Sequence, residues 1–578
     1  MTTINAWRSR LTMGWFIGAL ALGSILLPLT STGATNAVAW EVFVHDYLDG
    51  YFALNPSYAA FQGRHEYDGR LPDWSEAGLQ RKVAWLEAKR AEALAYKDDT
   101  LDAAQRFERD YLVAQTRGDL FWLVTADAPH KNPYFYADAI DPDMYVSRAY
   151  APLSERVAAY IKYARAVPVA LAQIKENLKG PQSQPLLKIG DQVIGGLADF
   201  CEQDIPEVFA SVLTGPVQTE FAEANSAAIK AVREFSGWIG EREKTASADF
   251  ALGPEKFRAM LRETEGVDLP LDELEAIGQK DMERNLQALQ EACALYAPGK
   301  SIEAAIAQAW AHKPTGGVVS YAGQQLKDLE KFVRAHDLLS IPGTEEAKVE
   351  QAPAYKSWNF AYINIPGPYE HGLPSIYSVA PADPAWPQQK QDEYVPGIAN
   401  LLFTSAHEVW PGHFVQYLHA NRVPSKLGQV FVGYGFAEGW AHYAEEMMWE
   451  AGLGEGSPEI HIGQLLEALE RNARFLSAIG LHTKGMTIEE SEKLFRDKGH
   501  TVAGVADQQA RRGTFDPAYL NYTLGKLMIR KLRADWTTTR GGRTAWHEFH
   551  DTFLSYGGPQ IPLVRRAMLG DADKGTLF

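Results

Sequence analysis

The chain has 578 residues, of which 46% are hydrophobic and 22% are charged. These are ordinary values for a globular protein, so a disordered or fibrous class is excluded. The formal net charge of -17 would repel nucleic acid, because nucleic-acid binding depends on basic side chains that neutralise phosphates. No basic cluster compensates, and we expect no nucleic-acid partner. Length alone leaves the number of domains open.

The first 39 residues have the pattern of a targeting segment. Arg8 and Arg10 precede an uncharged apolar run over residues 11–29, and Ala37-Val38-Ala39 supplies the small residues of a cleavage site. We therefore predict a secretory signal and an exported protein, periplasmic or secreted. The alternative is an uncleaved membrane anchor, because the run is long enough to span a bilayer. No cysteine lies near the predicted cleavage site, which argues against a lipid anchor.

The remainder, residues 40–578, reads as one helix after another. In residues 80–96, apolar Ala84, Ala88, Ala91 and Leu94 recur at three-to-four spacing with charges between them, as in an amphipathic helix. Similar patterns lie at residues 151–178, 220–242, 273–296, 302–310, 436–451, 463–478 and 520–536. We expect a single, mainly α domain.

Alternation long enough for a sheet is scarce. Residues 318–321 and 355–363 are the best strand candidates, so the expected β content is minor. Residues 363–394 are rich in Pro, Gly and aromatic side chains, which indicates a long ordered loop whose bulky residues need burial.

Cys201 and Cys293 are the only two cysteines. Export permits a disulfide, but two cysteines do not make a disulfide framework. A zinc site built on cysteine is excluded by number. The sequence leaves open whether the two form one bridge or stay as two buried thiols.

The strongest chemical signal is His407-Glu408-Val409-Trp410-Pro411-Gly412-His413, followed by Glu438 on a second predicted helix. Imidazoles and carboxylates in this combination are typical of a hydrolytic zinc site. The gap between the histidines is two residues longer than in HExxH. On an ideal helix, residues at i and i+6 lie about 240° apart around the axis and could not share a metal.

Pro411-Gly412 offers a physical way round this difficulty. Proline clashes with the carbonyl one turn earlier and donates no hydrogen bond, so the helix must widen or break. Glycine permits the unusual backbone that follows. We expect a widened, π-like turn that brings His413 back towards His407, with both imidazoles converging on Glu438. The competing interpretations are a polar patch at a helix break, a solvated helix face for Glu438, and His442 as a rival ligand.

These motifs resemble the bacterial family called domain of unknown function 885, whose hallmark is HExxPGH followed by a Gly-Trp-Ala helix, here Glu438-Gly439-Trp440-Ala441. His442 departs from the apolar residue expected at its position. Other matching motifs span residues 55–56, 63–72, 512–517, 519–526, 549–551, 555–558 and 562–563. The family is similar to gluzincin-like zinc peptidases such as thimet oligopeptidase and carboxypeptidase Taq. That resemblance implies a large multi-helix, zincin-like ellipsoid with a deep central channel, and short peptides as substrates.

The resulting hypothesis is a zinc metallopeptidase. His407, His413 and Glu438 would bind Zn²⁺, and Glu408 would act as general base on a water. Tyr522, which lies in a family motif, is the first candidate for an oxyanion donor, with His550 second. Arg512 would hold a substrate carboxylate. The alternatives are an inactive binding protein that keeps the peptidase fold, and an amidase for non-peptide amides. Cleavage mode and oligomeric state stay open.

Overall fold

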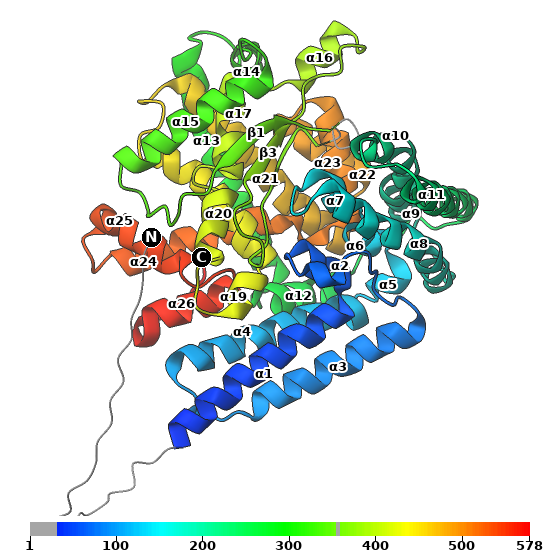
Figure 1. Cartoon of the computed structure of the whole chain (residues 1–578). Coiled ribbons are helices and arrows are strands. Elements are labelled where there is room, and N and C mark those ends of the chain that lie inside the picture. The colour runs from blue at the N-terminus through cyan, green and yellow to red at the C-terminus, as the bar shows by residue number, and fades with distance from the viewer. Residues whose placement is uncertain (1–31, 354–358) are drawn as a thin grey trace, which may run out of the picture.

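The computed structural model describes residues 32–353 and 359–578, which are predominantly helical (Figure 1). The predicted signal segment lies outside the described residues, except that residues 32–39 begin α1. Among the helices described, none combines the length and apolar character needed to cross a membrane.

The first half of the chain forms one group of helices around its own apolar core. That core includes fully buried Trp40, Tyr47, Tyr136 and Tyr160, together with the free, buried thiol of Cys201. The principal helices are α1 (Thr32–Leu54), α2 (Pro56–Phe61), α3 (Glu76–Ala95), α4 (Ala103–Leu120), α8 (Leu153–Asn177), α9 (Gln184–Gly190), α10 (Leu197–Phe209) and α11 (Pro216–Glu243).

The second half builds another, larger core, to which Cys293 belongs, also as a free thiol. The helix α13 packs along α21, and α20 packs along α24. The helices α20 and α24 approach closely where two glycines meet, since a Cβ on Gly439 would lie only 2.5 Å from the Gly525 Cα. The helices here are α12 (Pro254–Met260), α13 (Leu271–Tyr296), α14 (Ile302–Trp310), α15 (Val318–Ala335), α16 (Gln388–Tyr394), α17 (Ile398–Glu408), α18 (His413–Ala420), α19 (Lys426–Val430), α20 (Tyr434–Glu450), α21 (Pro458–Thr483), α22 (Ile488–Asp497), α23 (Ala503–Phe515), α24 (Asn521–Thr537), α25 (Trp546–Leu554) and α26 (Ile561–Leu569).

A small three-stranded sheet is the only sheet in the described residues. Its order is β1-β3-β2, with β1 (Ala347–Gln351) parallel and β2 (Ala361–Asn364) antiparallel to β3 (Ser375–Val379). The sheet lies against α17, where the hydroxyls of Tyr377 and Ser405 are 3.3 Å apart. It therefore supports the helix that carries His407.

Two of the strand and loop predictions need correction. Residues 318–321 begin the helix α15, whose buried residues recur at helical spacing down to Val333. Residues 363–394 are not one loop, because they contain β3 and α16. Of the predicted strand 355–363, residues 355–358 lie outside the described part, and β2 begins at Ala361.

The start of α20 is anchored by a buried carboxylate, Glu265. Its Oε1 accepts a hydrogen bond from Asn521 Nδ2 (2.6 Å), and the carboxylate also accepts from the Gly435 backbone N–H. Burial nevertheless raises the pKa of Glu265 to about 8, against an ordinary value of 4.5, and these two hydrogen bonds only moderate the shift.

This shift predicts how stability depends on pH. The folded chain holds a proton on Glu265 that the unfolded chain releases, so the associated stability is complete below about pH 4.5 and is lost as pH rises through 8. Each pKa unit corresponds to about 1.4 kcal/mol, so wild type should lose a few kcal/mol across this window relative to Glu265→Gln. Urea denaturation at a series of pH values checks this. Parallel profiles for the two proteins would contradict it.

Candidate metal centre

The helix that carries His407 breaks before His413. Here α17 ends at Glu408 and α18 begins at His413, and the Trp410–Pro411 peptide bond is cis. A Cβ on Gly412 would lie 1.7 Å from the His407 carbonyl oxygen, so only glycine fits this turn. The expected distortion is therefore confirmed, but the expected π-like turn is wrong. The chain leaves the helix instead of widening it.

The break brings the three predicted ligands together. His407, His413 and Glu438 each offer one ligand atom, and these atoms lie within 4.8 Å of one another. Glu438 Oε2 is 3.2 Å from His407 Nε2 and 3.3 Å from His413 Nε2. Ligands at about 2.0–2.1 Å from a tetrahedral zinc are separated by about 3.3 Å. The donor set and the two distances from Glu438 to the histidines therefore fit Zn²⁺.

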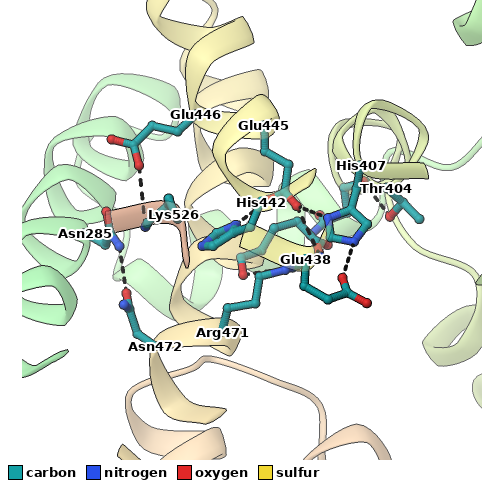
Figure 2. Close-up of polar contacts among 12 residues, drawn as sticks. Asn285, Thr404, His407, Glu438, His442, Glu445, Glu446, Arg471, Asn472 and Lys526 are labelled. Carbon is teal, nitrogen blue, oxygen red and sulfur yellow. Dashed lines mark hydrogen bonds and ion pairs between the residues drawn. The ribbon is translucent and has the colours of Figure 1, made fainter. Parts of the chain in front are cut away.

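The orientation of the His407 ring is set by Glu445. His407 Nδ1 donates to Glu445 Oε1 at 2.7 Å, which leaves Nε2 to face Glu438 (Figure 2). The same carboxylate is 3.2 Å from His442 Nδ1 and 3.2 Å from Arg471 Nη2. A carboxylate of this kind fixes the tautomer of a metal-binding imidazole and raises its basicity.

The rival ligand, His442, lies behind the centre. It is fully buried and is not part of the three-residue cluster. Burial, with the charge of Lys526, lowers the pKa of His442 to about 3, so the ring is neutral and bonds to Glu445. The structure therefore favours Glu438 over His442 as the third ligand.

Neighbouring charges shift the pKa values of Glu438 and His407 strongly. Burial alone would raise the pKa of Glu438, but His413 and His407 lower it well below its ordinary value. Burial would likewise lower the pKa of His407, but Glu438 and Glu445 outweigh it and raise that pKa to about 9. Glu438 and Glu445 thus stay ionised and stabilise positive charge at the imidazoles. A divalent cation bound there would supply such a charge.

Glu408, like Glu445, is a carboxylate beside the centre that is not part of the ligand cluster. It is the last residue of α17 and is half-buried. Burial raises its pKa, whereas His413 and His407 act in the opposite direction. A carboxylate with a raised pKa next to the ligands has the properties of a general base.

Most of the chain matches one known protein family. Residues 56–568 match the family described as "Bacterial protein of unknown function (DUF885)". The chain belongs to the DUF885 family. No curated protein sequence matches it.

Two solved structures share the fold of this DUF885 chain. A protein of unknown function from Shewanella oneidensis, described as a candidate lipoprotein, has a TM-score of 0.75 at 21% identity, over 92% of this chain and 99% of its own. A candidate lipoprotein from Colwellia psychrerythraea has a TM-score of 0.76 at 16% identity, over 92% and 98%. A third protein, described as a candidate oligoendopeptidase F from Bacillus anthracis, reaches only 0.30 at 13% identity, over 85% and 93%, which is too low to indicate a shared fold. The relationship to helical zinc peptidases therefore stays a prediction.

Among the remaining predicted site residues of this DUF885 protein, Tyr522 lies at the centre. Its ring stacks near His407 with centroids 6.1 Å apart. Arg512 lies behind it, with Nη2 3.5 Å from the Tyr522 hydroxyl and 2.9 Å from that of Tyr434. The Arg512 guanidinium also pairs with Asp516 at 2.9 Å. Its charge is therefore already matched, and its role towards a substrate carboxylate stays a prediction.

His550 does not join the site. It is fully buried, its Nδ1 donates to the Leu338 carbonyl (2.7 Å), and its Nε2 accepts from the Tyr443 hydroxyl (2.6 Å). Burial lowers its pKa to about 3. With both nitrogens engaged and no exposure, His550 packs the core behind α20, and we do not assign it a catalytic role.

Two residues beside the centre are not among the predicted site residues, although the sequence places Glu445 among acidic groups that either orient the ligating imidazoles or lie at the surface. Glu445 follows Glu438 by two helical turns, so it shares the face of α20 that meets His407, but only the packing of α20 on α17 identifies its partner. Tyr417 lies one turn after His413 on α18, and burial, with the charge of Glu438, raises its pKa to about 12. The periodicity of α18 could have indicated Tyr417, because residues at i and i+4 share a face.

Proposed function

We propose that this protein is an exported zinc-dependent hydrolase that cleaves amide bonds of short peptides. The observation that carries the proposal is the convergence of His407, His413 and Glu438 at spacings that suit tetrahedral zinc, beside a further carboxylate, Glu408. Three protein ligands leave a fourth position open, as catalytic zinc sites do and structural ones do not.

In this proposal each residue around the metal has a separate role. Bound zinc would lower the pKa of a water in the open position to about 7. Glu408 would act as the general base that takes a proton from the attacking water and as the acid that passes it to the leaving amine. Glu445 holds the His407 ring so that Nε2 faces the metal.

Tyr522 is the proposed hydrogen-bond donor to the developing oxyanion. Burial and the charge of Glu438 raise its pKa, so the phenol keeps its proton at neutral pH and can donate. The Arg512 guanidinium, at 3.5 Å from its oxygen, holds the phenol in place. Donors of this kind contribute on the order of 10²–10³ in turnover.

The substrate class and location rest on other grounds. Short peptides are proposed from the family resemblance, because a deep channel admits chains but not folded proteins. Export is proposed from the N-terminal pattern of basic residues, apolar run and small residues. The description of both structural relatives as candidate lipoproteins agrees with export.

A mixed library of peptides and non-peptide amides tests the activity directly. The purified chain, loaded with zinc or stripped by a chelator, is incubated with the library and the products are read by mass spectrometry. We expect peptide cleavage that depends on zinc. Products from the non-peptide amides alone would make the protein an amidase, and no products from any amide would indicate a binding protein.

A further inference from the structure

A cavity of about 210 Å³ lies at the junction of the two halves of the chain, next to the start of α20. Its lining includes Tyr111, Asp119 and Trp122 from α4 and the segment after it, and Tyr434 and Asn521 from the first residues of α20 and α24. Its volume suits one long side chain rather than a whole peptide. Nothing in the proposed chemistry at the metal uses it.

The cavity offers hydrogen-bond acceptors that the protein itself does not satisfy. Asn521 is 1% exposed, and its Oδ1 has no hydrogen-bond partner, while its Nδ2 donates to Glu265. Asp119 Oδ1 accepts from Gln115 (3.2 Å), and its buried Oδ2 has no partner at ordinary hydrogen-bond length and angle, although the Tyr51 hydroxyl is near the carboxylate. Buried acceptors are rarely left unpaired in proteins. The two together therefore indicate a ligand that brings donors.

The charge of the cavity specifies the kind of donor. None of the lining residues is basic, and two, Asp119 and Glu265, are acidic. Glu265 is occupied by Asn521 and the start of α20, so Asp119 supplies the negative charge that lines the cavity, with Lys82 as a more distant neighbour outside the lining. Burial raises the pKa of Asp119 to about 6, while Lys82 and the Tyr51 hydroxyl oppose the rise, so it is ionised at neutral pH. Lys82 donates to Asn55 Oδ1 (2.5 Å).

The aromatic walls favour the same ligand. A cation gains stabilisation from an aromatic face within about 6 Å, most strongly from tryptophan. Tyr111 and Trp122 line the cavity on the same side as Asp119. A methylene chain that ends in a cation would therefore find apolar walls along its length and a carboxylate at its end.

The cavity is close enough to the metal centre for both to contact the same substrate. Tyr434, in its wall, lies one turn before Glu438 on α20. The Tyr434 ring is 5.9 Å from that of Tyr522, which is 6.1 Å from that of His407. One helical turn spans about 5.4 Å and an extended peptide rises about 3.3 Å per residue. A peptide at the metal would thus reach the cavity with a side chain within about three residues of the cleaved bond.

On the basis of the proposed peptidase function, we propose that this cavity is a specificity pocket that binds a basic side chain, lysine or arginine, of the substrate peptide, with Asp119 as its counter-charge. The proposal names a substrate class that the metal centre does not determine. The free ammonium of a peptide N-terminus shares this chemistry, and the test separates the two.

Equilibrium binding tests the pocket without requiring turnover. Acetylated and amidated heptapeptides of alanine, with lysine or norleucine at the fourth position, are titrated calorimetrically into the zinc-loaded Glu408→Gln variant. The blocked ends make the lysine side chain the only cation, and an unblocked norleucine peptide supplies the N-terminal ammonium alone. We expect lysine to bind about 10- to 100-fold more tightly than norleucine, as for a hydrogen bond to a charged group. This comparison needs no substitution in the pocket.

Two further variants assign the preference to Asp119. Adding Asp119→Asn should abolish it, whereas Asp110→Asn, at an exposed position of the same helix, should leave it intact and so excludes the general negative charge of the protein as the cause. Three results would overturn the proposal. They are equal binding of the lysine and norleucine peptides, tighter binding of the unblocked norleucine peptide than of the lysine peptide, and a lysine preference that survives Asp119→Asn. If the wild-type chain prefers the lysine peptide but cleaves no peptide, the proposed hydrolase function is contradicted, whereas the proposed pocket is supported.

Discussion

Glu408→Gln should lower the turnover of zinc-loaded enzyme by about 10²- to 10⁴-fold, the range that a positioned general base supplies. Glutamine has the shape of glutamate but cannot take a proton from water. Zinc content should not change, because Glu408 is outside the ligand cluster. Initial rates on a peptide taken from the library, with zinc measured on the same samples, check both halves of the prediction.

A suitable control is Glu393→Gln, the same substitution at an exposed position of α16. Its rate should match wild type. If Glu408→Gln retains a rate within tenfold of wild type, another group takes the proton and the assignment of Glu408 is wrong. If instead zinc is lost with activity, Glu408 contributes to metal binding.

Lys526→Met should destabilise the protein by about 3–5 kcal/mol, the usual cost of removing one partner from a buried ion pair. Lys526 is fully buried, and its Nζ lies 2.8 Å from Asp281 Oδ2 and 3.5 Å from Glu446 Oε2 (Figure 2 shows Lys526 and Glu446). Methionine fills a similar volume but leaves those buried carboxylates with less positive charge. The midpoint of urea denaturation measures the effect.

The matched control for this substitution lies on the same helix. Lys531 pairs with Asp535 at 2.6 Å and has a side chain that is 29% exposed. Lys531→Met should cost at most about 1 kcal/mol, as a partly solvated pair does. Equal stability of the two variants would show that the charge network behind α20 is not what holds α13, α20 and α24 together.

Most helices could be predicted because their apolar residues recur at helical spacing over many turns. The strands could not. The burial of β3 shows no clean alternation, and the four-residue pattern at Val318 is too short to separate a strand from the first turn of α15. Short apolar segments leave the two structures equally plausible.

The convergence of His407, His413 and Glu438 could be predicted from residue type and spacing, together with the Pro411-Gly412 break. Whether the helix widens or breaks could not, because Pro and Gly permit both. The position of His550 away from the ligand cluster could not be predicted for a related reason. A motif gives its position in the chain but not which side of α20 it packs against, and here it meets Tyr443 rather than the ligands.

Zinc content is the measurement that tests the central claim most directly. The purified chain, a His413→Ala variant and a Glu438→Gln variant are reconstituted with zinc, dialysed, and analysed by atomic emission. The account predicts one zinc ion per wild-type chain and little in either variant, with all three proteins folded by circular dichroism. A wild-type chain that binds no zinc, or variants that bind as much as wild type, would contradict it.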